Sequence, residues 1–254
     1  MEKLILVTND DGIEAPGLKA LALALKKAGK VVVVAPDKER SATSHAVTLY
    51  SPLKIEKFGA NKIKVDGTPA DCVMLAVKKL LKRRPDLVVA GINPGPNLGD
   101  DVNYSGTVSA ALEGAMLGIP SFSISMASRD DLRFETAGLV AARIARTIFS
   151  YGMPPRVALN VNVPNLALAH LKGLAITRQG LRVYKDEIKV TKDPEGKSLY
   201  WITGEEPGWE DEEETDFKAI EKKMVSITPL HPDLTSFKSM PHFSGWGKII
   251  HELH

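Results

Sequence analysis

The sequence predicts an α/β protein: a Rossmann-like three-layer α/β/α sandwich with a mostly parallel sheet and a C-terminal β-hairpin extension for oligomerisation. Three observations support this prediction. Short apolar runs alternate with helical segments, polar or glycine-containing turns follow the apolar runs, and the alternation weakens after residue 163. Alternating strands and helices of this kind form parallel sheets that helices cover on both faces.

The first strand–helix–strand unit spans residues 4–34. Residues 4–7 and 31–34 are short apolar runs that end in polar turns, which predicts two buried strands. The Ala-, Leu- and Lys-rich residues 17–27 between them predict a helix that stops at Gly29. The same pattern recurs in predicted strands at residues 87–91, 121–125 and 157–163 and in predicted helices at residues 108–117 and 136–149.

Residues 1–180 are expected to form the core, and residues 181–254 a hairpin and a C-terminal segment. Residues 181–188 and 198–203 flank a turn that contains Pro and Gly, which predicts a long β-hairpin. A two-stranded hairpin alone is only marginally stable in water. We therefore expect the hairpin to pack on another subunit or on the tail, and residues 224–230 to rejoin the core.

Composition and charge exclude several classes of protein. The 254 residues are 44% hydrophobic and 25% charged, as in ordinary globular proteins. The net charge of +2 demands neither a nucleic-acid duplex nor a membrane as partner. Cys72 is the single cysteine and excludes an intrachain disulfide. Since no secretory signal and no apolar run of about 20 residues is recognisable, we expect a cytoplasmic protein.

The loops at the carboxyl ends of the predicted strands hold the candidate site, because parallel α/β sheets bind their ligands there. Asp10 and Asp11 are adjacent in the first loop, next to Asn9. Two carboxylates converge only if a cation or a shared proton relieves their repulsion, so the pair indicates a metal site. The alternative interpretation is an Asp–Gly turn in which one carboxylate caps the following helix.

The second and third loops add hydroxyl, amide and cationic groups. These side chains are Lys38, Arg40, Ser41 and His45 in the second loop and Asn93 and Asn97 in the third. The two asparagines lie among glycines and prolines, where they either shape turns or face a ligand. Oxygen donors without a thiolate or an obvious histidine cluster favour Mg²⁺ or Mn²⁺.

A predicted helix begins immediately after Ser105, Gly106 and Thr107. Either hydroxyl can cap this helix, and a helix N-terminus with free N–H groups beside a glycine also binds anions. Thr68 and Asp71 form a capping box, for which we expect a structural role. Neither a dinucleotide-binding glycine pattern nor a phosphate loop occurs, which argues against a dehydrogenase or a P-loop enzyme.

Taken in order, these motifs resemble those of the SurE (survival protein E) family of nucleotidases. The motifs are residues 8–12, 35–41, 67–73, 91–99 and 105–107, with a weaker likeness at residues 159–164, 215–217 and 226–230. The resemblance implies a divalent-metal-dependent phosphatase that hydrolyses nucleoside monophosphates to nucleoside and phosphate. It also implies a homodimer or homotetramer that exchanges hairpin and C-terminal segments. Residues 222–224 and Pro94 depart from the family's pattern.

The resemblance further implies roles for individual residues in metal and phosphate binding. Asp10, Asp11, Ser41 and Asn93 would bind the metal, and Asn97, Ser105, Gly106 and Thr107 would bind the phosphate. Asp10 and Asp11 would also be catalytic. Further candidates for substrate contacts in the same loops are Asn9, Lys38, Arg40 and His45. Two carboxylates, a divalent cation and a phosphate dianion leave an excess of negative charge, so we expect Lys38 or Arg40 to add positive charge.

Alternatives for the chemistry stay open. We favour attack by water over an aspartyl-phosphate intermediate, because the Asp-x-Asp arrangement usual in covalent aspartate phosphatases is absent. A regulatory module that binds nucleotides without hydrolysis is the alternative function, although adjacent carboxylates repel phosphate unless a metal intervenes. Tyr104 and Phe134 are aromatic residues that could stack on a base, but we expect both in the core.

Overall fold

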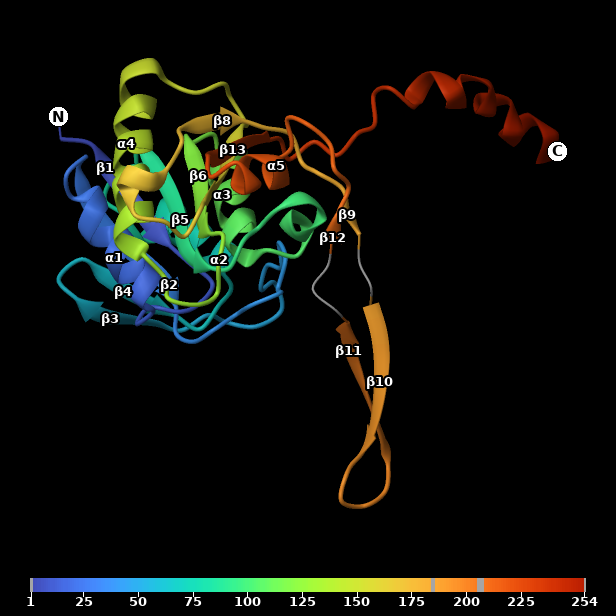
Figure 1. Cartoon of the computed structure of the whole chain (residues 1–254), viewed down its shortest axis with the longest axis horizontal. Helices are drawn as coiled ribbons and strands as arrows, with labels where there is room; N and C mark the ends of the chain where they lie inside the picture. Colours follow the sequence, from blue (N-terminus) through green and yellow to red (C-terminus); the bar gives the residue numbers. More distant parts are fainter. Residues whose placement is uncertain (1, 184–185, 205–207, 254) are drawn as a thin grey trace.

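The computed structural model describes residues 2–183, 186–204 and 208–253. Within these residues, nine strands form one sheet in the order β3-β4-β2-β1-β5-β6-β7-β13-β8 (Figure 1). In chain order the strands of this sheet are β1 (Leu4–Thr8), β2 (Lys30–Pro36), β3 (Ile55–Gly59), β4 (Lys62–Val65), β5 (Leu87–Pro94), β6 (Ser121–Met126), β7 (Ala158–Val163), β8 (Leu174–Ile176) and β13 (Val225–Leu230).

The middle of the sheet is parallel. β4, β2, β1, β5, β6 and β7 run parallel to their neighbours, whereas β3 pairs antiparallel with β4 and β13 pairs antiparallel with β7. The prediction of a mostly parallel α/β sheet is therefore confirmed. The carboxyl ends of the parallel strands all reach the same end of the sheet, which is where the sequence places the polar loops.

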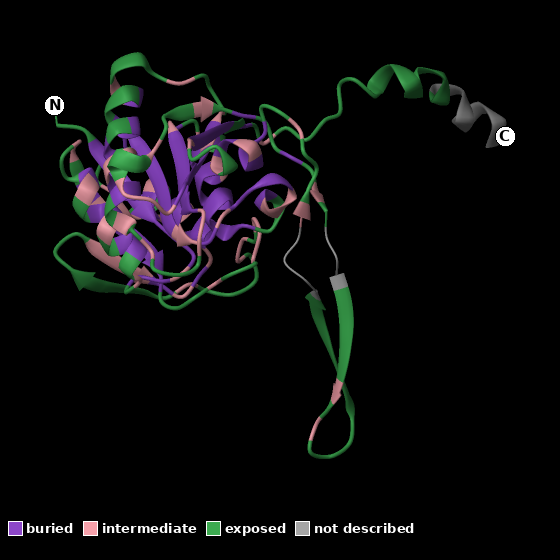
Figure 2. Cartoon of the chain, in the orientation of Figure 1, coloured by how far each residue is buried: buried purple, intermediate pink, exposed green. Residues whose placement is uncertain are grey.

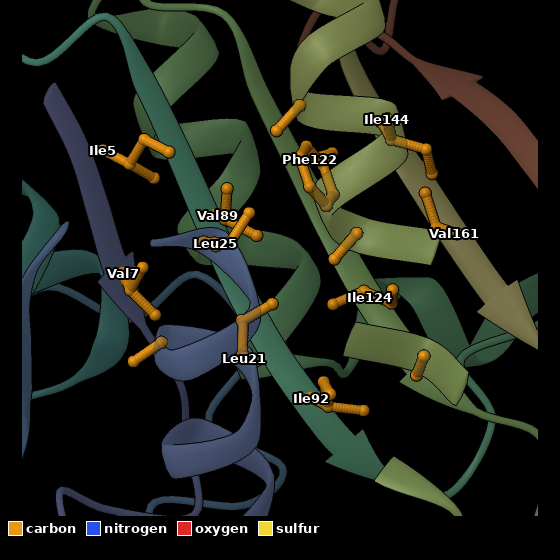
Figure 3. Close-up of a cluster of buried hydrophobic side chains, with 14 of the residues drawn as sticks. Ile5, Val7, Leu21, Leu25, Val89, Ile92, Phe122, Ile124, Ile144 and Val161 are labelled. Carbon is orange, nitrogen blue, oxygen red and sulfur yellow. The ribbon is translucent and has the colours of Figure 1, made fainter. Parts of the chain in front are cut away.

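Helices cover both faces of the sheet. α1 (Pro16–Leu25) packs beside α4 (Phe134–Tyr151) on one face, and α2 (Pro69–Leu75) packs beside α3 (Gly106–Met116) on the other. Successive strand residues point to opposite faces. Ile5 and Val7 of β1 are accordingly buried against α1 and α4 (Figure 3), whereas Leu6 between them is buried on the side of α2 and α3.

Short helices complete the chain, and one predicted cap is observed in atomic detail. They are the π-helix η1 (Ala76–Leu80), the 3₁₀ helices η2 (Gly99–Asn103), η3 (Leu168–His170) and η4 (Met240–Leu253), and α5 (Asp216–Glu221). At the start of α2 the Thr68 hydroxyl accepts the Asp71 N–H at 3.1 Å and the Asp71 carboxylate accepts the Thr68 N–H at 2.9 Å. Among the described helices, none has the length and apolar character needed to cross a bilayer.

A hairpin projects from the sandwich. β10 (Asp186–Lys192) pairs antiparallel with β11 (Ser198–Gly204), and β9 (Arg182–Val183) pairs with β12 (Gly208–Trp209) at its base (Figure 1). The predicted first strand, residues 181–188, is therefore displaced toward the C-terminus. After β13, residues 231–253 lead away from the core and end in η4, and Figure 2 shows most of the hairpin and of residues 231–246 as exposed.

Candidate active site

The loops that follow β1, β2 and β5 meet at one end of the sheet. β1 lies between β2 and β5, and Thr8 at the end of β1 pairs with Ala90 of β5. The loop after β2 is tied to the loop after β1, because the backbone N–H of Arg40 donates to the carbonyl oxygen of Asp10 at 2.7 Å. The topology therefore brings together three of the polar segments that the sequence singled out.

The N-terminus of α3 lies against Asp10. The Thr107 hydroxyl donates a hydrogen bond to Oδ1 of Asp10, and Asp10 is only 5% exposed. A Cβ atom at Gly106 would lie 3.0 Å from the Cβ atom of Asp10 and 3.1 Å from its Oδ2 atom. Glycine at position 106 thus permits an approach that another residue would obstruct, and the positive end of the α3 dipole faces this carboxylate.

Asp10 and Asp11 are two carboxylates in a poorly solvated place. Burial raises the pKa of Asp10, against the lowering effect of its hydrogen bond with Thr107. Burial, followed by the charge of Asp10, raises the pKa of Asp11 to about 7. Within the described residues, Oδ2 of Asp11 and Oδ1 of the neighbouring Asn9 are buried without a hydrogen-bond partner. Buried oxygen atoms without donors, beside two carboxylates, fit a divalent cation.

Asn93 and Ser41 differ in how they face this pair. Nδ2 of Asn93 donates to the carbonyl oxygen of Gly95 at 2.9 Å, which leaves Oδ1 as the acceptor for a ligand. The Ser41 hydroxyl is exposed and donates to Oε1 of Glu39 at 2.7 Å. The structure thus ties the loop of Ser41 to Asp10 through Arg40, but in the described residues the Ser41 hydroxyl itself is directed at Glu39.

The donor set available to a cation is made of oxygen atoms. Among the described residues, no group of three or more His, Cys, Asp or Glu side chains is placed to hold a metal. A cation at Asp10 and Asp11 would therefore need neutral oxygen donors as well, and Asn93 and Ser41 offer an amide and a hydroxyl. Carboxylate, amide and hydroxyl oxygens suit the hard cations Mg²⁺ and Mn²⁺ better than they suit zinc.

Asn97 is held rigidly behind the third loop. Its backbone N–H donates to Oδ1 of Asn162 at 2.9 Å, and its carbonyl oxygen accepts from Nδ2 of Asn160 at 2.8 Å and of Asn162 at 3.0 Å. Its own Nδ2 donates to the Ser125 hydroxyl at 2.8 Å and keeps a second hydrogen for a ligand. Neither Asn160 nor Asn162 was expected to have a role, although two asparagines at alternate positions of a buried strand are a recognisable signal.

Ser105 and Thr107 occupy different positions at the start of α3. The Ser105 hydroxyl oxygen accepts the N–H of Val108 at 3.1 Å, which makes Ser105 the N-cap and leaves its own proton available to a phosphate. Thr107 is 0% exposed and its proton goes to Asp10. The structure therefore shows Thr107 as a support for Asp10, whereas a direct phosphate contact by Thr107 stays a prediction.

Arg40 and Lys38, the two cationic side chains of the second loop, differ in their surroundings. Arg40 forms an ion pair with Asp37 at 3.1 Å and donates to the carbonyl oxygen of Asp66 at 3.0 Å, so its guanidinium connects the loop to the end of β4. Lys38 is exposed. Of the two cations that we expected near the phosphate, Arg40 thus already carries a counterion.

His45 contacts α3 rather than the carboxylate pair. Nε2 of His45 lies 2.9 Å from Oε2 of Glu113, a buried residue of α3 that the sequence analysis did not single out. Tyr104 was expected in the core but is 63% exposed, because η2 ends there at the surface. Phe134, in contrast, packs against the core cluster.

Comparison with known proteins identifies the family. A model of the family described as "Survival protein SurE" matches residues 5–186. The chain belongs to this family. A SurE protein named 5′-nucleotidase SurE, from Geobacter sulfurreducens, is 49% identical over 243 residues, which cover 95% of this chain and 93% of that protein.

Two further SurE proteins agree with this assignment. The 5′-nucleotidase SurE of Aquifex aeolicus is 49% identical over 237 residues, covering 92% of this chain and 94% of that one. The crystal structure of the SurE protein from Aquifex aeolicus matches with a TM-score of 0.87 and 47% identity, covering 98% of this chain and 99% of that chain. The likeness thus includes the hairpin and the tail as well as the sandwich.

Proposed function

We propose that this protein is a divalent-metal-dependent phosphatase that hydrolyses nucleoside monophosphates to nucleoside and phosphate. The observation that carries this proposal is the adjacent pair of Asp10, which is buried against the N-terminus of α3, and the half-buried Asp11, whose Oδ2 atom has no hydrogen-bond partner among the described residues. The curated relatives named 5′-nucleotidase SurE support it, since their likeness to this chain extends over almost its whole length.

We propose Asp10, Asp11, Asn93 and Ser41 as the residues that hold the cation, with Mg²⁺ or Mn²⁺ as the ion. When bound, such a cation polarises a phosphoryl oxygen and makes a water molecule more acidic. Thr107 fixes the carboxylate of Asp10 for this purpose. To bind the cation, Ser41 would have to turn its hydroxyl away from Glu39, and its exposed side chain is free to change rotamer.

The phosphate would lie between the third loop and α3. Ser105 can donate its hydroxyl proton, and Asn97 can donate the second hydrogen of Nδ2. Gly106 lets the substrate approach the helix start, where N–H groups and the dipole favour an anion. Asp11 lies beside the proposed cation and is the candidate to accept a proton from water.

Direct attack by water is the favoured route. Asp10 is buried and accepts a hydrogen bond from Thr107, which reduces the nucleophilicity of its carboxylate. A phosphorylated aspartate trapped by rapid quench and found by peptide mapping would overturn this preference. Inversion of configuration at phosphorus, measured with a substrate whose phosphoryl group is made chiral by isotopes and sulfur, would support it, because two successive displacements through a phosphorylated aspartate would give retention.

The experiment that tests the function measures phosphate release from a panel of nucleoside monophosphates by metal-stripped protein. Mg²⁺, Mn²⁺, Ca²⁺ or Zn²⁺ is added back, and Asp10→Asn is the control. We expect metal-dependent release that the control lacks. Nucleotide binding without release under any metal would favour the alternative, a regulatory module, and would leave the adjacent carboxylates unexplained.

We also infer a homodimer or homotetramer that acts in the cytoplasm. Apolar side chains of the hairpin lie in solvent in the single chain, among them Ile188, Trp201 and Ile202, with Phe237 and Trp246 in the tail. Burying such side chains against a second chain is favourable. The single buried Cys72 suits a reducing compartment.

A further inference from the structure

The proposed site contains more negative than positive charge. Asp10 and Asp11 together balance a divalent cation, so a phosphate dianion would enter without compensation. Arg40 is already paired with Asp37 at 3.1 Å. Because a partner of opposite charge favours a dianion in a poorly solvated site, a cation beside the third loop would strengthen phosphate binding.

Arg129 is a cation that the sequence analysis did not consider. It lies three residues after β6, which pairs with β5 so that Asn93 is opposite Ser125. A Cβ atom at Gly95 would lie 3.2 Å from Cζ of Arg129 and 3.4 Å from each of its terminal nitrogens. The guanidinium therefore lies against the backbone of Gly95, which a side chain at that position would prevent.

Gly95 connects Arg129 to the proposed cation site. Its carbonyl oxygen accepts the hydrogen bond from Nδ2 of Asn93 at 2.9 Å, so Asn93 and Arg129 contact the same residue. The φ angle of +124° at Gly95 belongs to the region that favours glycine. Asn93 and Arg129 thus contact different atoms of the same turn residue.

Arg129 is also accessible and uncommitted. Within the part of the chain that the structure describes, its guanidinium has neither a hydrogen bond nor an ion pair. It lies on the wall of a cavity of about 630 Å³ that Arg182 and the acidic residues Asp101, Asp130 and Glu221 also line. A small ligand can therefore reach this guanidinium from solvent, on the β6 side of the loop that carries Asn93.

We propose that Arg129 binds the phosphoryl oxygens of the substrate and compensates the charge that the two aspartates and the cation leave over. This inference rests on the proposed phosphatase function. A guanidinium suits the role because its fork of N–H groups can bind two oxygens of one phosphate and remains charged at every working pH. Arg129 would contribute to substrate binding, so its loss should lower the affinity for every phosphate ester, whatever the leaving group.

The test compares Arg129→Gln and Arg129→Lys with Arg133→Gln, an exposed arginine four residues further along the chain. The direct readout is the dissociation constant of inorganic phosphate for the Mn²⁺-loaded protein, measured by calorimetry. We expect Arg129→Gln to weaken phosphate binding about tenfold and Arg129→Lys less, because a point charge replaces a bidentate group. Arg133→Gln should match the wild type.

Kinetics with two substrates complete the test. For a nucleoside monophosphate and for p-nitrophenyl phosphate, KM should rise about tenfold in Arg129→Gln while kcat changes less than about twofold. A higher KM for the nucleotide alone, with unchanged phosphate binding, would overturn the proposal and place Arg129 against the nucleoside. Unchanged phosphate affinity and KM would also overturn it. A wild type that binds phosphate but hydrolyses nothing would contradict the proposed function, while the binding measurement would still test Arg129.

Discussion

The carboxyl end of the sheet and the hairpin differ in whether their side chains contact other parts of the chain or solvent. At the sheet end, polar groups from loops distant in sequence contact one another: Arg40 with Asp10, Asp10 with Thr107, and Asn97 with Asn162. In the hairpin, apolar side chains such as Ile188 and Ile202 face solvent. The single chain thus brings these loops into contact, whereas it leaves the apolar side chains of the hairpin exposed.

Removing the charge of Asp10 should have the largest effect. Asp10→Asn keeps the size of the side chain but removes a proposed metal ligand, so we expect activity to fall at least about 100-fold. Because burial raises the pKa of Asp10, its charge costs stability in the metal-free protein, and the Tm of metal-free Asp10→Asn should not fall. Substantial activity at ordinary metal concentration would exclude Asp10 as the ligand.

Adding one methyl group at the start of α3 should have the next largest effect. In Gly106→Ala the new Cβ atom would meet Asp10 at 3.0 Å, so the helix or the carboxylate must shift. We expect a loss of activity of roughly 10- to 100-fold and a destabilisation of roughly 1–3 kcal/mol.

Gly208→Ala at the base of the hairpin is the matched control for that substitution, because a Cβ atom there meets nothing within 4 Å. Activity assays and denaturant titrations measure both variants. Equal behaviour of the two variants would contradict the tight fit that distinguishes the sheet end from the hairpin.

Metal binding should depend on pH through Asp11. Its pKa is raised from 3.8 to about 7, so the folded metal-free protein holds a proton that the unfolded chain has lost. The contribution of this group to stability is fully present below the unfolded pKa and is lost as the pH rises through about 7. A cation competes with that proton, so the rise in Tm on adding Mn²⁺ should be larger at about pH 8 than at about pH 6.

Asp11→Asn provides the control for this pH dependence, because the amide does not titrate. In that variant the rise in Tm on adding Mn²⁺ should be small and should not change with pH. If the wild type showed the same rise at both pH values, Asp11 would not be the titrating ligand.

The smallest effect on the folded chain is expected from the hairpin. Ile202, which pairs with Ile188, is 83% exposed, so Ile202→Asp should change the unfolding free energy of the single chain by less than about 0.5 kcal/mol. The mass measured by light scattering should nevertheless fall, because a charge would be buried in the proposed interface. Ser198→Asp, an exposed position in the same strand, controls for added negative charge, and an unchanged mass in Ile202→Asp would exclude this face from assembly.

Local patterns explain the elements that were predicted correctly. The buried strands β1, β2, β5, β6 and β7 read as apolar runs, and the capping box of Thr68 and Asp71 is a contact within four residues. β3 and β4 were not predicted, because both strands are short and rich in charged residues, which the exposed edge strand β3 tolerates. β8 has only three residues, too few for a periodic signal.

Contacts between distant residues account for the remaining differences. Nothing local in the sequence places Glu113 beside His45 or Asn160 beside Asn97, because α3 and β7 come to these loops only through the sheet. Tyr104 is exposed although aromatic residues are usually buried in part, because it lies between the end of η2 and the start of α3 at the surface. The displaced hairpin register follows from the turn at Asp193, whose carboxylate accepts two backbone N–H groups.

The sequence by itself determined the parallel α/β class, the three polar loops and the adjacent aspartates, because periodicity and adjacency are properties of the chain. Only the tertiary structure decided that Thr107 supports Asp10, that Arg40 is paired with Asp37 and that Arg129 lies against Gly95. Each of these assignments depends on which group comes within hydrogen-bond or van der Waals distance of another. That proximity is created by the pairing of strands far apart in the sequence.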